Sequence, residues 1–370
     1  MKSNKEYLTF IGLVLSLDNN FDRINSVRSL LRDEKIDFEK LNWILSTHLM
    51  LPAFYVKMKK FKLLFYLPKD FVKHLEDIYT MNKNRNTQIL KQIAEMSRDL
   101  HKHRIAPVYL KGCAMILNNE YEDIGERMIG DIDFLVKEDE MQIAAKVLID
   151  KGYTPLVPFE NSQLKLYKHY PRLINENKTA AIEVHQFLLR PPKHHLSLKV
   201  SEFIAESQKN ERFENTYIPS EKHLILHNIL NTSVNDTGFY RGTIHLRQLF
   251  ELFLLLRKNS IEAILGDFNS HREKIITNCI IMDEIFRSRS ISQSNRLRFR
   301  FIKALVLYMV DKPRLYNAIH IIVYLMWRLY NNLSVLVKAM FEKELRVSVL
   351  KRLNDPKWYK EHLKSYLNVS

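Results

Sequence analysis

The sequence contains little glycine and cysteine for its length. Eight of its 370 residues are glycine, and only Cys113 and Cys279 are cysteine. Two cysteines argue against a disulfide framework and against a cysteine zinc site, and they favour a reducing compartment. The most apolar late stretch, residues 318–327, is too short to span a bilayer and is followed by Arg328. We therefore expect no integral membrane segment.

The N-terminus only superficially resembles an export signal. Lys2 and Lys5 precede an apolar run over residues 7–17. The polar stretch 18–22 then follows without a small-residue cleavage pattern. We therefore expect a buried first helix and a cytoplasmic protein.

Basic residues exceed acidic ones. Fifty-seven lysines and arginines against 42 acidic residues leave a formal charge of +15. Such an excess favours an anionic partner, which is a nucleotide, a nucleic acid or an acidic membrane surface, without choosing among them. The hydrophobic content of 46% is ordinary for a globular protein.

The hydrophobic pattern divides the chain into three regions. Residues 1–104 have helical periodicity and end in a long amphipathic segment, 70–104. Residues 105–190 alternate strands with helices and finish in a hairpin of residues 169–175 and 179–188. Residues 191–370 read as helices to the end, among them 313–331, 333–345 and 356–367. The pattern predicts an α+β protein with a small mixed-sheet core at 105–190 between two helical regions.

Half of the glycines fall between residues 107 and 153, where polar side chains also gather. Lys111-Gly112 ends a predicted strand just before a helix, and backbone N–H groups at such a turn favour anions. Asp131 and Asp133 open the next strand and project to the same side. Neighbouring carboxylates repel unless a cation lies between them, and oxygen ligands suit Mg²⁺ or Mn²⁺. The alternative is an exposed strand start with no ligand.

Glu183 lies in the middle of an apolar strand, where an unpaired buried carboxylate is costly. If this strand neighbours that of Asp131 and Asp133, three carboxylates converge on one place. Such a triad suits two cations that activate an attacking oxygen and hold a triphosphate.

Together these segments carry a family resemblance. Lys111-Gly112, the run Gly-Asp-Ile-Asp-Phe-Leu-Val at 130–136, and Lys-Gly-Tyr at 151–153 follow one another with helices between them. Ile-Glu-Val-His at 182–185 comes later. This order resembles the uncharacterised nucleotidyltransferase family of the DNA polymerase β-like superfamily. The resemblance covers residues 90–190 best.

The resemblance implies roles for particular residues. Asp131, Asp133 and Glu183 correspond to metal-binding and catalytic carboxylates, with Glu183 as general base or organiser of the attacking hydroxyl. Lys111 and Gly112 correspond to the nucleotide-phosphate turn. The superfamily more usually has Gly-Ser or Gly-Gly there, so the hydroxyl contact is absent, although a lysine binds phosphate as a point charge.

Further residues are candidates for contacts to the nucleotide or substrate, and each has a purely structural role as its alternative. Arg127 either contacts the γ-phosphate or forms an ion pair with Glu122 or Glu126. His185 shares a face with Glu183, and His169 with Lys168 lies on the neighbouring strand. These are phosphate or substrate contacts, or satisfied structural side chains. Tyr240, Arg241 and His245 are candidates for the acceptor side.

The predicted function is metal-dependent transfer of a nucleoside monophosphate from an NTP, with Mg²⁺ or Mn²⁺, to a hydroxyl of an unidentified acceptor. RNA, a small molecule and a protein all remain as acceptors. Two alternatives stay open. One is a nucleotide-binding or scaffold protein without turnover, motivated by the unusual turn at Lys111. The other is a basic helical adaptor for nucleic acid or an anionic surface.

Overall fold

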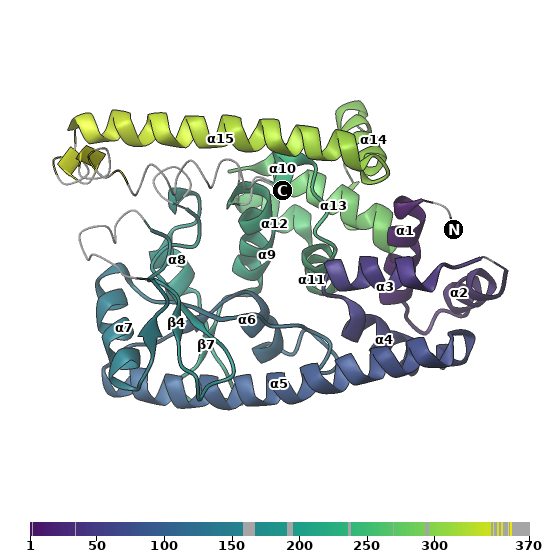
Figure 1. Cartoon of the computed structure of the whole chain (residues 1–370), viewed down its shortest axis with the longest axis horizontal. Coiled ribbons are helices and arrows are strands. Elements are labelled where there is room, and N and C mark those ends of the chain that lie inside the picture. The colour runs from purple at the N-terminus through teal and green to yellow at the C-terminus, as the bar shows by residue number, and fades with distance from the viewer. Residues whose placement is uncertain are drawn as a thin grey trace.

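The computed structural model describes residues 1–341 and scattered positions between 343 and 356. Within 1–341, the description leaves out positions 2, 34, 158–166, 191–194, 236–237, 269 and 293–295. The protein is mixed α+β: a seven-stranded mixed sheet has helices on both sides, as predicted. Figure 1 shows the sheet at one end of the molecule, beside a larger helical part that contains both the first and the last helices.

The N-terminal region is helical, as its periodicity indicated. Its helices are α1 (Asn4–Leu15), α2 (Phe21–Asp33), α3 (Phe38–Thr47), α4 (Leu51–Lys60), a 3-10 turn (Leu64–Tyr66) and α5 (Lys69–Lys102). Ser3 caps α1 by accepting the Glu6 N–H, and the Glu6 carboxylate accepts the Ser3 N–H in return. Most of α1 is buried, in agreement with the expected buried first helix.

The sheet has the strand order β3-β4-β5-β2-β1-β7-β6. The strands are β1 (Val108–Tyr109), β2 (Ile132–Leu135), β3 (Thr154–Pro155), β4 (Leu173–Ile174), β5 (Ile182–His185), β6 (Gln208–Lys209) and β7 (Tyr217–Ile218). The predicted hairpin is present, since β4 and β5 pair antiparallel. Helix α6 (Lys111–Leu117) follows β1, and α7 (Met141–Asp150) follows β2 and a short 3-10 turn (Glu138–Glu140).

Two strands come from a part of the chain that was expected to be helical. Tyr217 in β7 pairs with Val108 in β1, and β6 pairs with β7. The expectation of uninterrupted helix after residue 190 was wrong here. Strands of two residues show no alternation, and their pairing depends on the edge of β1 that β2 leaves unpaired, which local sequence does not reveal.

The rest of the described chain is helical. It comprises a 3-10 turn (His195–Ser197), α8 (Val200–Ala205), α9 (Glu221–Leu230), a π-helical turn (Asn231–Asn235), α10 (Gly238–Arg241), α11 (Leu246–Leu256), α12 (Ile261–Asp267), α13 (Arg272–Phe286), α14 (Leu297–Val310) and α15 (Pro313–Phe341). Helix α15 is continuous where two helices were expected. The predicted helix at 356–367 lies outside the described residues except for its first position. Among the described helices, none has the length and apolar character to cross a membrane.

The alternation of β2 directs its side chains into two different cores. Ile132 and Phe134 pack with α5 and α7 on one face of the sheet. Leu135 belongs to the larger core that joins the N-terminal and C-terminal helices. Asp133 has the same parity as Leu135, so it faces the helical part of the molecule. The space between sheet and helices is therefore where a site containing Asp133 must lie.

Candidate active site

The parallel pairing of β2 with β5 brings Asp133 and Glu183 together. The register sets Asp133 directly opposite Glu183, and Leu135 opposite His185. Since side chains two apart on a strand share a face, His185 projects to the same side as Glu183. The two strands are neighbours in the sheet, which is the condition that the predicted carboxylate cluster required.

His185 lies between the two carboxylates. Its Nε2–H donates to Asp133 Oδ1 at 2.8 Å, and Glu183 Oε2 is 3.4 Å from the same nitrogen. The His185 side chain is 1% exposed, and its Nδ1 has no hydrogen-bond partner among the described residues. Ligand atoms of these three residues all lie within 4.8 Å of one another.

The Lys111 ammonium occupies the space beside the same carboxylates. It forms an ion pair with Asp133, and Nζ is 3.7 Å from Glu183 Oε2. Burial alone would raise the pKa of Asp133, but the Lys111 charge and the His185 hydrogen bond outweigh it and hold that pKa well below its usual value. Lys111 itself has a positive φ of 51°, which is unusual for a residue with a side chain.

Glu183 is also ionised at neutral pH. Burial raises the pKa of Glu183 and Asp133 raises it further, whereas the His185 hydrogen bond, His169 and Lys111 lower it. The net direction is downward. An ionised, half-buried carboxylate beside a second one is able to accept a proton or hold a cation.

Asp131 lies at the rim of this cluster and has a different partner. Its carboxylate accepts from Arg172, a residue just before β4 that the sequence reasoning did not single out. Burial, together with the charges of Glu183 and Asp133, raises the pKa of Asp131 despite Arg172. The three carboxylates therefore influence one another electrostatically. Asp131 nevertheless lies outside the closely spaced group formed by Asp133, Glu183 and His185.

The Arg127 guanidinium packs closely against Gly112. A Cβ on Gly112 would lie 2.8 Å from Arg127 Cζ, so the guanidinium packs against the turn. Arg127 Nε donates to Glu251 Oε1 of α11 at 2.6 Å. Neither of the expected ion-pair partners is correct: Glu122 pairs with Lys57 and Lys60, and the Glu126 carboxylate accepts the Asp123 N–H.

Comparison with known families identifies the chain. A family model described as uncharacterised nucleotidyltransferase matches residues 34–272, which includes the whole sheet and most helices around it. The chain belongs to this family. It is therefore a nucleotidyltransferase, in agreement with the resemblance of residues 90–190. A search of curated proteins finds no match.

The nucleotidyltransferase has a cation-rich cavity beside Lys111. It lies between α6, α9 and α11 and is lined by Lys111, Met115, Arg127, Leu224, His227, Asn228, Asn231, Arg247, Gln248 and Glu251. Three cationic side chains, Lys111, Arg127 and Arg247, surround its single acid, Glu251. Burial and the nearby Arg127 charge lower the pKa of Arg247. His227 Nε2 and Arg247 Nε are buried without hydrogen-bond partners among the described residues.

Sequence reasoning missed His227 and Arg247 because both lie on helices that looked like packing elements. The only signal was Leu-Arg-Gln-Leu-Phe-Glu-Leu at 246–252, where Arg247 and Glu251 are one turn apart within an apolar helix. His169 does lie near the cluster: its ring centroid is 5.1 Å from that of His185, and its Nδ1–H donates to the Tyr170 carbonyl. Lys168 Nζ is 3.5 Å from Asn231 Oδ1.

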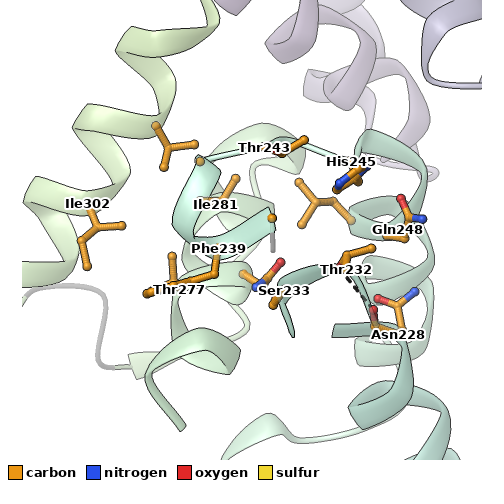
Figure 2. A pocket seen from close by; sticks show the side chains of 15 residues that line it. Asn228, Thr232, Ser233, Phe239, Thr243, His245, Gln248, Thr277, Ile281 and Ile302 are labelled. Atoms are coloured by element: carbon orange, nitrogen blue, oxygen red, sulfur yellow. Dashed lines mark hydrogen bonds between the residues drawn. The ribbon is translucent and has the colours of Figure 1, made fainter. Parts of the chain in front are cut away.

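A second cavity adjoins the first and shares Asn228 and Gln248 with it. Figure 2 shows hydroxyl, amide and imidazole groups around it, together with Phe239. Thr277 Oγ1 is buried without a hydrogen-bond partner among the described residues. Of the three residues expected on the acceptor side, only His245 lines this cavity. Tyr240 is 60% exposed, and Arg241 contacts His320 of α15.

The donor set fits a divalent cation. Carboxylate oxygens of Asp133 and Glu183 suit Mg²⁺ or Mn²⁺, and the adjacent imidazole of His185 is a further ligand that Mn²⁺ accepts more readily than Mg²⁺. Two ionised carboxylates this close are stable only beside positive charge, which Lys111 provides in this structure.

Proposed function

We propose that the protein transfers a nucleoside monophosphate from an NTP to a hydroxyl group, with release of pyrophosphate and with Mg²⁺ or Mn²⁺. The observation that carries the proposal is the cluster of Asp133, Glu183 and His185 beside a cavity rich in buried cations. Phosphoryl-type transfer depends mainly on positioning and charge neutralisation, and this arrangement offers both.

Asp131, Asp133 and Glu183 are the proposed metal-binding carboxylates, with His185 adjoining them. When bound, the cation neutralises phosphate charge and makes the attacking hydroxyl more acidic. Glu183, which is ionised at neutral pH, is the proposed acceptor of the proton of that hydroxyl. The acceptor oxygen then forms a bond to the α-phosphorus as the bond to the bridging oxygen breaks, and pyrophosphate leaves with the electron pair.

The cavity beside Lys111 is the proposed phosphate site. Lys111, Arg127 and Arg247 supply positive charge there, and the unpartnered Arg247 Nε offers a donor for a phosphate oxygen. Gly112 lets the Arg127 guanidinium approach the turn. His169, which pairs with His185 at the end of β5, is a proposed contact to the nucleotide.

The second cavity is the proposed acceptor site. No lysine, arginine, aspartate or glutamate lines it, whereas Ser, Thr, Asn and Gln side chains and the Phe239 ring do. Such a lining favours an uncharged hydroxylated group over a phosphate backbone. The cavity has a volume of about 30 Å³, which admits a hydroxyl-sized group and not a whole acceptor, so its lining does not choose among RNA, a small molecule and a protein.

A cytoplasmic setting is part of the proposal. NTPs are abundant there, and both cysteines, Cys113 and Cys279, are buried free thiols, as a reducing compartment allows.

A second candidate is nucleotide binding without turnover. The ion pairs of Lys111 favour it, because the ammonium already occupies the space between Asp133 and Glu183. This candidate predicts metal-dependent NTP binding with no pyrophosphate release under any condition.

Pyrophosphate release tests the proposal. The wild type, Asp133→Asn and Glu183→Gln are incubated with NTP, Mg²⁺ or Mn²⁺, and separate pools of RNA, protein and small metabolites. We expect release with one pool, reduced at least about a hundredfold in both variants. Asp139→Asn, which removes one charge at an exposed position, is the matched control. Release that persists in Asp133→Asn would contradict the proposed role of this carboxylate.

A further inference from the structure

Helix α15 has an apolar face that no described part of the chain covers. The helix lies along one edge of the molecule, on the side opposite α5 (Figure 1). Most of its large apolar side chains are exposed, with Met326 at 66% and Leu329 at 62%. Steps of four and three residues place a row of them on one face: Ile322, Met326, Leu329, Leu333, Leu336 and Met340.

The opposite face of α15 contacts the protein. The Tyr316 hydroxyl is 2.9 Å from Thr243 Oγ1, and the Arg190 guanidinium lies 5.2 Å from the centre of the Trp327 ring. Ile319 packs against the main core. The helix is therefore held in place by one side, and its exposure on the other side is not a consequence of detachment.

The sequence around this face is basic. Between residues 296 and 341, Asp311 is the only acidic residue, whereas arginine or lysine stands at 296, 298, 300, 303, 312, 314, 328 and 338. The Asp311 carboxylate accepts the backbone N–H groups of Asn4 and Lys5 at the start of α1. Arg298 and Lys303 form ion pairs with Glu273 and Glu284, and Arg328 is buried. Arg296, Arg300, Lys312 and Arg314 are exposed.

A nucleic acid and a second copy of the chain each fit only one of the two features, the apolar face or the charge. A nucleic acid would match the basic residues but would leave the apolar row in water. A second copy of the chain would cover the apolar row but would bring two basic surfaces together. A bilayer with anionic headgroups matches both, because apolar side chains enter the interface while arginines and lysines meet the phosphates.

We propose that α15 lies in the plane of an anionic lipid bilayer, with the row from Ile322 to Met340 inserted into the interface. The helix spans no membrane; it binds one surface reversibly. This proposal is independent of nucleotide transfer, and it assigns a place of action to the protein.

Flotation with lipid vesicles tests the proposal. The full-length protein is mixed with vesicles of phosphatidylcholine alone or of phosphatidylcholine with phosphatidylglycerol. We expect binding to the anionic vesicles, weaker binding to the neutral ones, and a decrease with rising salt. The double variant Leu329→Glu/Leu333→Glu should bind the anionic vesicles at least about tenfold more weakly than the wild type, because it puts charge into the inserted face.

Met81→Glu is the matched control, since Met81 is a 68% exposed apolar side chain on α5, far from α15 in Figure 1. Its vesicle binding should equal that of the wild type. Circular dichroism and melting temperature verify that the double variant folds. Equal binding by the double variant, or no binding by the wild type, would overturn the proposal. The proposal would also be overturned if the wild type formed a dimer, the double variant were monomeric, and neither bound vesicles.

Discussion

Lys111 combines two features that rarely coincide in one residue. It has a positive φ, and its ammonium lies beside both Asp133 and Glu183. Backbone strain of this kind persists where surrounding contacts stabilise it. The ion pairs supply those contacts, and they also place the ammonium where a divalent cation would compete with it.

Replacing Lys111 with methionine tests this competition. We expect Lys111→Met to bind Mn²⁺ about tenfold more tightly in the absence of nucleotide, since the ammonium no longer neutralises the carboxylates. NTP binding should weaken in the same variant, because a phosphate contact is lost. Electron paramagnetic resonance measures free Mn²⁺, and Lys137→Met, at an exposed lysine after β2, is the control. Unchanged or weaker Mn²⁺ binding by Lys111→Met would contradict this account.

Glu126 gives a pH-dependent prediction. Burial raises its pKa from 4.5 to about 7, although the Asp123 N–H hydrogen bond opposes the shift. Because the pKa of Glu126 is higher in the folded state, its protonation adds to the free energy of unfolding. That contribution is complete below pH 4.5 and is lost as the pH rises through 7. Glu126→Gln keeps an acceptor but has no charge to bury. We expect it to raise the free energy of unfolding by up to about 3 kcal/mol at pH 8 and to leave it unchanged at pH 4.

Urea denaturation at the two pH values measures the difference. A variant that is less stable than the wild type at pH 8 would show that Glu126 is stabilised as a charged group, contrary to the burial argument.

At the scale of elements, the chain order of strands and helices could be predicted where each element is long or is bounded by distinctive turns. The amphipathic helix 70–104 corresponds to α5, and the strand containing Asp133 corresponds to β2. Strands β6 and β7 could not be predicted, because two residues carry no periodicity and their position is decided by pairing with β1. Periodicity also did not reveal that α15 continues past residue 331.

The contact between α1 and α13 depends on Gly12. A Cβ at this position would collide with the Ile285 carbonyl oxygen and side chain. Gly12→Ala should therefore separate the two helices and destabilise the protein by about 1–3 kcal/mol, measured as a lower melting temperature. Gly266→Ala in α12 is the control, because nothing lies within 4 Å of its added Cβ. The control should be neutral or slightly stabilising, since alanine favours helix. If Gly12→Ala were as stable as the wild type, the two helices would be able to move apart at no cost, contrary to this prediction.

At the scale of the whole molecule, the ion pair of Arg127 with Glu251 joins the sheet region to the C-terminal helices. Local sequence predicted a site at Asp133 and Glu183, because an acidic residue in an apolar strand is costly without a partner. It did not show that Arg172 would pair with Asp131, or that Glu251 would pair with Arg127. Those pairs join residues distant in sequence, and only the packing of helices on the sheet determines them.

The family match extends across this junction, from residue 34 to residue 272, so the cation-rich cavity belongs to the matched part of the chain. We therefore propose that the sheet and the helices around it act together as one catalytic unit.

The most direct test of that account compares NTPs labelled at the α- or the γ-phosphate. The wild-type protein is incubated with each, with Mn²⁺ or Mg²⁺ and the acceptor pools, and Asp133→Asn is run beside it. The account predicts that acceptor gains label from the α-phosphate only, that the γ-label appears in pyrophosphate, and that both signals are lost in Asp133→Asn. Transfer of the γ-label to acceptor would contradict nucleotidyl transfer, and α-label transfer by Asp133→Asn would contradict the assigned site.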